Sequence, residues 1–389
     1  MILKYDCRHF PGDRPCKPHK ETGVICDTCP HYETVSFKIL IIKLDAMGDV
    51  LRTTSLLHAL KKEHPVSFIT WLTKFNAKDI FKNNDLVDEV LVYEEPSTVI
   101  RLAEEEFGLV INLDPSPQSS ALASMAKAEK KTGFGLNKNG KVFPFNHEAE
   151  EWFEMGAFDK FKSANKKSYQ QIIHEICGLK YDKGRIIINL TNRETEKGKE
   201  FASQNGLSKY DYLIGINAGA SDRWEYKKWR TEGYIQLMKK LSSEFNCAFL
   251  LFGGKNEVEL NRNLLSAVPG VYSTGNNNTF RDFASYVSLV DVLITGDTLA
   301  LHVSAGLGIF TVCLFGPTSS AEIEDYGLIK KITPDMNCLV CYKNTCDLKP
   351  NCMELITTDM VFAAVKNILL NKLVLGYPPG HLFQDKSDN

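Results

Sequence analysis

Three short segments of the sequence place polar or charged side chains directly after an apolar run. The first is IIKLDAMGDVLRTT (residues 41–54), in which Gly48 and Asp49 follow a predicted strand and begin a predicted helix. A carboxylate in the first turn of a helix is stabilised by the helix dipole and can accept a proton from an incoming hydroxyl group. Asp49 is therefore a candidate general base for group transfer, with a simple N-cap role as the alternative.

The second segment, INAGASDRWEYKKWRTEGY (residues 216–234), combines small residues around Gly219 with a cationic stretch. Its cations are Arg223, Lys227, Lys228 and Arg230. Such a stretch standing alone would be a solvated charged surface. Its position just after a predicted strand favours a pyrophosphate site, because backbone amides and cations can gather there around a phosphate.

The third segment, LITGDTLALHVSAGLGIFTVCLFGPT (residues 293–318), has the highest density of candidate site residues of the three. Asp297 and Thr298 follow a predicted buried strand, and His302 lies one helical turn beyond Thr298. Taken singly, Asp297 could cap a helix and His302 could be a half-buried imidazole without a ligand. Taken together, polar residues at strand ends in both halves of the chain predict a ligand bound between the halves.

Buried strands and helices must alternate along the chain to position these segments. Two successive sets of apolar runs begin at Phe37: KILIIK, VSFITW, EVLVY and LVINL, and then YLIGIN, CAFLLF, DVLIT and FTVCLF. Helical stretches separate the runs, which is typical of βαβ units and a parallel sheet. The length of 389 residues favours two domains. We expect an α/β fold with two Rossmann-like lobes and a cleft between them.

The expected domain boundaries follow changes in composition. Residues 1–32 have four cysteines and no apolar periodicity, and they predict a cysteine-rich, metal-binding knuckle. The other predicted units are an N-terminal Rossmann-like lobe (33–195), a C-terminal Rossmann-like lobe that includes a cysteine cluster at 338–352 (205–360), and a C-terminal helix and tail (361–389). A polar, highly charged stretch between residues 184 and 208 marks the interdomain region.

Charge and hydropathy exclude several classes of function. Lys and Arg number 46 against 48 Asp and Glu, so the net charge of −2 provides no general attraction to nucleic acid. No apolar run reaches the length of a membrane span, and Asp6, Arg8 and Asp13 lie where a signal peptide needs an apolar stretch. We expect a cytoplasmic protein with no nucleic-acid partner, either free or in peripheral contact with the inner membrane.

Eight of the eleven cysteines fall in two clusters. The first cluster is Cys7, Cys16, Cys26 and Cys29, and the second is Cys338, Cys341, Cys346 and Cys352. Cytoplasmic thiols stay reduced, so clustered cysteines indicate metal ligands before disulfides. We expect structural zinc, with an iron–sulfur cluster as the alternative. The two clusters could bind separately or share one site.

The order of these motifs resembles glycosyltransferase family 9, the ADP-heptose lipopolysaccharide heptosyltransferases, from about Phe37 to the C-terminal helix. The matching motifs are Gly48-Asp49-Val50-Leu51, then Gly219-Ala220 with Lys227-x-Trp229, then Gly296-Asp297-Thr298 with His302 and Phe315-Gly316-Pro317-Thr318. Arg230 stands where the family usually has proline. The resemblance implies a glycosyltransferase B fold, with an acceptor lobe first and a donor lobe second.

The resemblance also implies roles for individual residues. Asp49 is the expected base, and Lys227 contacts the donor phosphates, with Lys228 as the alternate. Glu257, which follows Gly253-Gly254, contacts the ribose of the nucleotide. The remaining donor-binding candidates are Gly48, Gly219, Asp297, Thr298 and His302.

The implied activity is an inverting transfer of heptose, or a related sugar, from a nucleoside diphosphate donor, ADP-heptose first among them. The expected partners are this nucleotide sugar and a glycan acceptor, either the lipopolysaccharide core or another glycolipid or polysaccharide. No catalytic cofactor is expected. Two alternatives are a nucleotide-sugar epimerase of the same two-lobe fold and a non-catalytic protein that binds nucleotide sugars.

Overall fold

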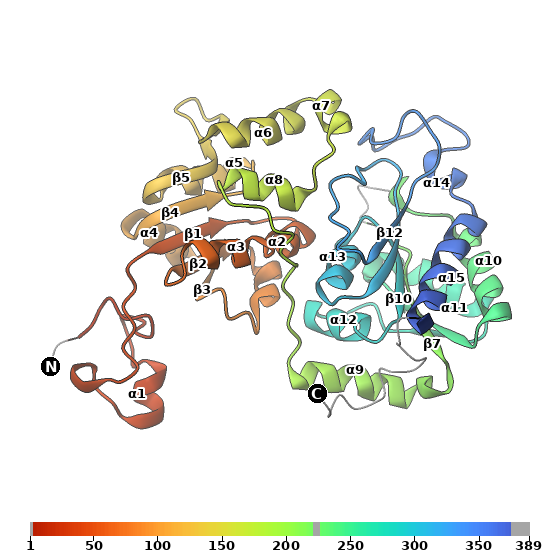
Figure 1. Ribbon diagram of the computed structural model, residues 1–389, viewed down its shortest axis with the longest axis horizontal. Helices are drawn as coiled ribbons and strands as arrows, with labels where there is room; N and C mark the ends of the chain where they lie inside the picture. The colour runs from red at the N-terminus through yellow and green to blue at the C-terminus, as the bar shows by residue number, and fades with distance from the viewer. Residues whose placement is uncertain (1–2, 221–225, 375–389) are drawn as a thin grey trace.

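The computed structural model describes residues 3–220 and 226–374. Its first sheet has the order β3-β2-β1-β4-β5-β6 and the second has the order β12-β11-β10-β7-β8-β9 (Figure 1). All neighbouring strands are parallel except β5 and β6, which are antiparallel. The protein is therefore an α/β molecule with two doubly wound sheets, as predicted.

The first sheet consists of β1 (Lys38–Ile42), β2 (Phe68–Thr73), β3 (Glu89–Val92), β4 (Glu106–Asn112), β5 (Lys127–Leu136) and β6 (Val142–Pro144). The second consists of β7 (Tyr212–Asn217), β8 (Cys247–Phe252), β9 (Val271–Ser273), β10 (Val292–Gly296), β11 (Phe310–Leu314) and β12 (Ile329–Ile332). Strand order reverses between β1 and β4 and again between β7 and β10. Ligands bind at such reversals in open α/β sheets, outside the carboxyl ends of the strands.

The helices lie on both faces of the two sheets (Figure 1). Those up to residue 176 are α1 (Lys17–Thr22), α2 (Met47–Thr53), α3 (Leu56–Glu63), α4 (Pro96–Glu104), α5 (Pro117–Met125), α6 (Glu150–Ala157), α7 (Asp159–Ala164) and α8 (Tyr169–Ile176). Those that follow are α9 (Asn192–Gln204), α10 (Thr231–Glu244), α11 (Val258–Ala267), α12 (Phe280–Val287), α13 (Leu299–Gly306), α14 (Cys352–Leu355) and α15 (Thr358–Val374). Short 3-10 helices are η1 (Cys26–Thr28), η2 (Phe75–Phe81), η3 (His147–Ala149), η4 (Leu207–Lys209) and η6 (Lys255–Glu257).

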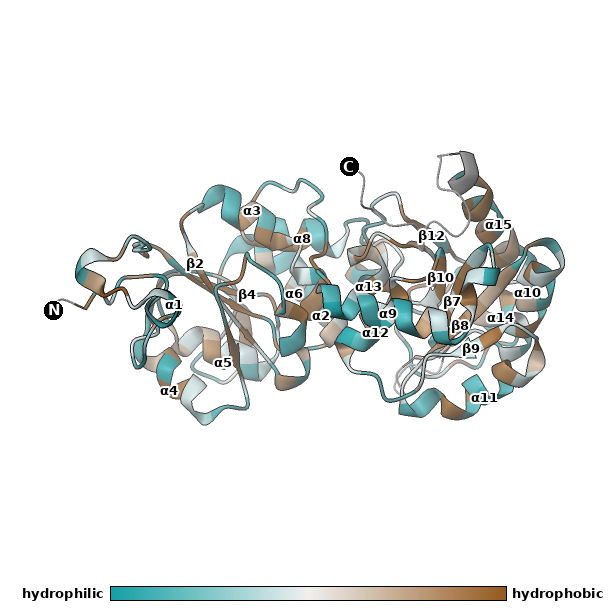
Figure 2. Ribbon diagram, turned by 90° about the horizontal axis from the view of Figure 1, so that it is seen from below, coloured by the Kyte–Doolittle hydropathy of each residue, from teal (hydrophilic) through white to brown (hydrophobic). Residues whose placement is uncertain are grey.

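Hydrophobic packing joins the two lobes. In Figure 2 the strands are mostly brown, that is apolar, and residues 39–42 of β1 are fully buried. One cluster of buried side chains extends from the first sheet through residues 186–188 to one face of the second sheet. This continuous apolar contact fixes how the carboxyl ends of the two sheets face each other.

The charged segment predicted to separate the domains forms the well-ordered helix α9. Thr191 and Glu194 build a capping box at its start, and the guanidinium of Arg281 in α12 pairs with the carboxylate of Glu194 at 2.6 Å. The side chain of Lys197 pairs with Asp282, also in α12, at 2.6 Å. These contacts explain the high charge of the segment, because its ionic side chains bind α12 of the second lobe.

The last helix, α15, packs on α10 through Val361, Val365 and Leu369, which are buried. It therefore completes the second lobe. Among the described residues, none of the helices combines the length and apolar character that crossing a bilayer requires.

Candidate functional site

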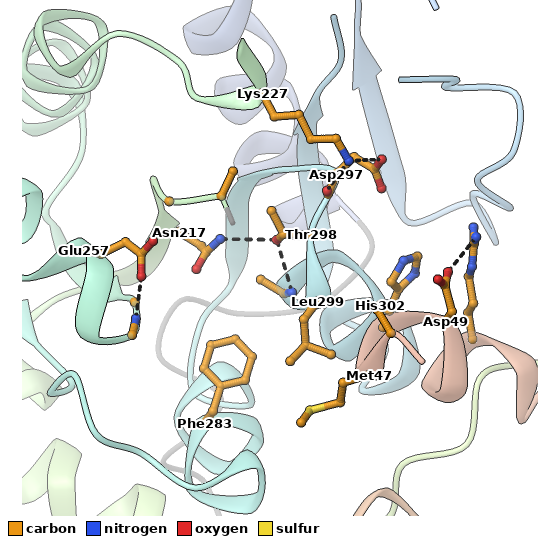
Figure 3. Close-up of a pocket in the computed structure, with 18 of the residues that line it drawn as sticks. Met47, Asp49, Asn217, Lys227, Glu257, Phe283, Asp297, Thr298, Leu299 and His302 are labelled. Atoms are coloured by element: carbon orange, nitrogen blue, oxygen red, sulfur yellow. Dashed lines mark hydrogen bonds and ion pairs between the residues drawn. The ribbon is translucent and has the colours of Figure 1, made fainter. Parts of the chain in front are cut away.

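A cavity of about 940 Å³ lies between the lobes, at the carboxyl ends of both sheets. All eight catalytic and donor-binding candidates from the sequence line it: Gly48, Asp49, Gly219, Lys227, Glu257, Asp297, Thr298 and His302. Figure 3 shows Asp49 and His302 at one side, Glu257 at the other, and Lys227, Asp297 and Thr298 between them. Arg223 and Trp224, from the same cationic segment as Lys227, lie outside the described residues.

Asp49 lies in the first turn of α2, and its side chain is 36% exposed toward the cavity. Its Oδ1 is 2.7 Å from Nη2 of Arg52, one turn later in the helix. Burial raises the pKa of Asp49, but the charges of Arg52, Lys43 and His302 outweigh it and lower the pKa to about 2. Asp49 is thus ionised at neutral pH.

Arg52 is a cavity residue that the sequence analysis does not identify. Its guanidinium lies 3.8 Å from the centre of the Tyr169 ring, and the Tyr169 hydroxyl lies 2.7 Å from Oγ1 of Thr53. The stacked ring fixes the guanidinium and so holds Asp49 in one position. The signal for Arg52 is its spacing of three residues from Asp49, which places both side chains on one helix face.

His302 contacts the first lobe at the edge of the cavity. A Cβ atom added to Gly48 would lie 3.0 Å from Cδ2 of His302, so α2 begins in close contact with α13, and a side chain at residue 48 would force the imidazole to shift. Burial lowers the pKa of His302 to about 4, with a further contribution from the charge of Arg52. The imidazole is therefore neutral at pH 7 and does not repel the nearby cations.

We expect the His302→Asn variant to lose part of the wild-type dependence of stability on pH. An unfolded chain protonates this imidazole near pH 6.5, whereas the folded chain does so near pH 4, so acidification between these values favours unfolding. The wild type should lose about 3 kcal/mol of stability across this window through His302 alone. Thermal unfolding from pH 4 to 7 measures how steeply stability falls with pH in each protein. His58→Asn is the control, because His58 is exposed. Equal slopes in the wild type, His302→Asn and His58→Asn would contradict the expectation.

Lys227 and Asp297 form an ion pair in the middle of the cavity. Nζ of Lys227 lies 3.0 Å from Oδ2 of Asp297, and both side chains are largely buried. Burial raises the pKa of Asp297, but Lys227 and His302 outweigh it and lower the pKa. The pair places one cation and one hydrogen-bond acceptor side by side, which suits a ligand that carries both phosphate and hydroxyl groups.

Thr298 is the N-cap of α13, since its Oγ1 accepts a hydrogen bond from the backbone N–H of Ala300 at 3.2 Å. Nδ2 of Asn217, at the end of β7, donates to the same oxygen at 3.3 Å. The cap aims the N-terminus of an eight-residue helix at the cavity, where the helix dipole favours an anion. Asn217 is a second cavity residue that the sequence analysis does not identify.

Glu257 lies beside a loop of small residues. Its Oε2 accepts a hydrogen bond from the backbone N–H of Gly254 at 2.7 Å. A Cβ atom on Gly219 would lie 2.3 to 2.5 Å from the side chain of Glu257, so this glycine leaves the space that the carboxylate occupies. The carboxylate can accept hydrogen bonds from a pair of vicinal hydroxyl groups, such as those of a ribose.

We expect Gly219→Ala to raise the KM for the donor by about 10- to 100-fold, the cost of losing a hydrogen bond to a charged group. The added methyl group must displace the carboxylate of Glu257. Gly254→Ala is the matched control, because its Cβ would make only an ordinary 3.5 Å contact with Oε2 of Glu257. Steady-state kinetics of both variants test this; a similar KM in both would show that Glu257 does not contact the donor.

Glu322 and Tyr342 come from loops of the second lobe, and the sequence analysis names neither of the two residues. The Tyr342 hydroxyl donates to Oε1 of Glu322 at 2.9 Å, and both residues line the cavity. Burial raises the pKa of Glu322. Phe283 of α12 also lines the cavity, and Figure 3 shows its ring directed into it on the side of Glu257. Tyr342 lies in the loop of the second cysteine cluster, but neither that cluster nor the segment around Glu322 indicates these two side chains.

The second cysteine cluster lies next to this cavity, on the loop that carries Tyr342 and on α14. Burial and, to a smaller extent, the neighbouring thiols of Cys341, Cys346 and Cys338 raise the pKa of Cys352 to about 11. Over residues 3–220 and 226–374, no three Cys, His, Asp or Glu side chains are arranged to hold a metal ion. Metal binding by Cys338, Cys341, Cys346 and Cys352 stays a prediction.

Comparisons with known proteins agree with this geometry. The sequence model of glycosyltransferase family 9 (heptosyltransferase) matches residues 98–351. Lipooligosaccharide heptosyltransferase 2 of Campylobacter jejuni is 28% identical over 167 residues, which cover 41% of this chain and 51% of the relative. The matches with the two Campylobacter relatives thus span about half of the relatives' length.

Two solved structures share the fold. A family 9 glycosyltransferase of Veillonella parvula has a TM-score of 0.66 at 20% identity, over 87% of this chain and 98% of the other. The ADP-heptose lipopolysaccharide heptosyltransferase II of Escherichia coli has a TM-score of 0.62 at 19% identity, over 86% and 99%. Both sheets of the present protein therefore have counterparts in one known two-lobe architecture.

Proposed function

The chain belongs to glycosyltransferase family 9, and on this premise we propose that it transfers a heptose from ADP-heptose to a hydroxyl group of a glycan acceptor, with inversion at the anomeric carbon. The acceptor we propose is the lipopolysaccharide core or a related glycolipid. The location we propose is the cytoplasmic face of the inner membrane, where such an acceptor is accessible. The C. jejuni relative and the E. coli structure, both named as heptosyltransferases, support the choice of sugar.

The observation that carries the proposal is the order of side chains along one cavity. Asp49 comes from the first lobe, whereas the second lobe supplies Lys227 and Asp297, the capped N-terminus of α13 after Thr298, and finally Glu257. A nucleotide sugar has the same order of chemistry: reacting sugar, diphosphate, ribose and base. In this arrangement the anomeric carbon faces Asp49, the diphosphate lies at Lys227 and α13, and the ribose lies at Glu257.

The chemical step follows from these positions. Asp49 takes the proton of the acceptor hydroxyl while its oxygen forms a bond to the anomeric carbon. The bond from that carbon to the diphosphate oxygen breaks, and the nucleoside diphosphate leaves with the electron pair. Lys227 and the N-terminus of α13 stabilise the negative charge that grows on the leaving group. Attack from the side opposite the leaving group inverts the anomeric centre, and no covalent enzyme intermediate forms.

The first experiment is to measure release of nucleoside diphosphate from ADP-, GDP-, UDP- and dTDP-sugars, each with and without an extract of lipopolysaccharide core. Release of ADP from ADP-heptose that depends on the acceptor supports the proposed transfer. Conversion of the donor sugar to an epimer without any acceptor would indicate an epimerase instead. Donor binding without turnover in any arm would indicate a non-catalytic binding protein.

A further inference from the structure

The N-terminal knuckle has a defined backbone without a hydrophobic core. It contains α1 and η1, and its ends pair through a β-bridge between Cys7 and Thr34. Its described residues, 3–32, include no buried side chain, and the first buried residue of the described chain is Ile39. A segment of this size cannot fold through hydrophobic burial alone and needs disulfides or a metal. None of its four cysteines is in a disulfide.

All four of these cysteines line a single cavity of about 390 Å³ inside the knuckle. Cys7 lies at the β-bridge, Cys16 is the N-cap of α1, Cys26 begins η1, and Cys29 follows η1. The β-bridge and α1 thus contribute one thiol each, and η1 with its C-cap contributes two, all to the same space. The thiols are half-buried, and in residues 3–32 they surround the cavity without meeting at one point.

We propose that the knuckle is a metal centre in which the thiolates of Cys7, Cys16, Cys26 and Cys29 bind a thiophilic metal, as zinc or as iron in an iron–sulfur cluster. Four thiolates complete the coordination of either centre. Binding draws the β-bridge, α1 and η1 together and supplies the stabilisation that a hydrophobic core supplies elsewhere, so metal binding and folding of the knuckle are coupled. The inference does not depend on the proposed transferase activity.

The position of the knuckle makes this centre structural and remote from the chemistry. Arg8, the neighbour of Cys7, forms an ion pair with Asp88 and donates to the backbone oxygen of Ser67 at 2.9 Å. Ser67 and Asp88 lie at the starts of β2 and β3, whereas the cavity that holds Asp49 lies at the carboxyl ends of the strands. Figures 1 and 2 both place α1 at the end of the molecule away from the second lobe.

The test is the metal content of the full-length protein, purified without oxygen, by elemental analysis, sulfide determination and absorption spectroscopy. C26S/C29S removes one Cys-x-x-Cys pair from the knuckle, and C341S/C346S removes two thiols from the other cluster. We expect C26S/C29S to lose one metal centre that C341S/C346S keeps. Zinc without sulfide, or iron with sulfide, identifies the centre. Equal metal content in the wild type and C26S/C29S would overturn the proposal.

His19→Ala is the matched control inside the knuckle, because His19 lines the same cavity but is not a proposed ligand. We expect the His19→Ala variant to keep the metal. Loss of the metal in this variant would overturn the four-thiolate ligand set.

Limited proteolysis of the wild type provides a readout that needs no variant to fold. A chelator should expose the knuckle to cleavage near residues 7–29 while the two lobes stay intact, and cleavage that is unaffected by metal removal contradicts the coupling.

Discussion

Replacing Asp49 with asparagine should lower kcat by about 10³-fold and leave the KM for the donor nearly unchanged. A general base contributes about 10²- to 10⁴-fold to the rate, and 10³-fold corresponds to about 4 kcal/mol of activation free energy. Asparagine keeps the size of the side chain and an oxygen that can face Arg52, but it cannot accept the proton of the acceptor hydroxyl. Donor affinity should persist, because the residues proposed to contact the phosphates and the ribose lie in the second lobe.

Asp45→Asn is the matched control for this experiment. Asp45 lies four residues before Asp49, is about half-exposed and pairs with Lys74 outside the cavity. The Asp45→Asn variant should therefore keep the wild-type rate. Single-turnover measurements with saturating donor and acceptor separate the chemical step from binding. Near-normal turnover by Asp49→Asn would show that another group takes the proton, and Glu322 is the next carboxylate on the cavity wall to examine.

Replacing Lys227 with methionine should lower kcat/KM by about 10²- to 10³-fold. Removing one partner of a buried, hydrogen-bonded charge pair costs about 2–5 kcal/mol. Here the loss has two parts, because the donor diphosphate loses a cation and Asp297 stays buried without its partner. Burial alone raises the pKa of such a carboxylate, so the variant should also lose activity on acidification at a higher pH than the wild type does.

Lys228→Met is the matched control, because it removes the same charge one residue further along, at a side chain that does not line the cavity. It should change kcat/KM less than threefold. Isothermal titration with ADP measures the binding part of the effect directly. A larger loss in Lys228→Met than in Lys227→Met would reverse the assignment between the two lysines, and equal small losses would place the diphosphate elsewhere in the cavity.

The sequence predicts eight of the twelve strands in the described part of the chain, all eight in apolar runs, and it does not predict β5, β6, β9 and β12. β5 reads KAEKKTGFGL and β12 reads IKKI. Both lie at or near the edges of their sheets, where the lysines reach solvent and burial no longer imposes an apolar pattern.

The sequence determined the fold class, and its resemblance to glycosyltransferase family 9 indicated the eight candidate residues that line the cavity. In a parallel sheet every strand ends at the same edge, so residues that follow Ile42, Asn217 and Gly296 must lie near one another within each lobe. The sequence could also have predicted that Arg52 lies beside Asp49, because residues three apart on a helix are neighbours.

Tertiary structure alone decided which loops complete the cavity and how the two lobes face each other. Glu322 and Tyr342 reach the site from segments whose sequence does not indicate a role for either side chain, and their positions depend on packing between the lobes. The backbone N–H of Tyr169 in the first lobe donates to the backbone oxygen of Glu322 in the second at 2.9 Å. Any residue type can make such a contact, so no local sequence pattern encodes it.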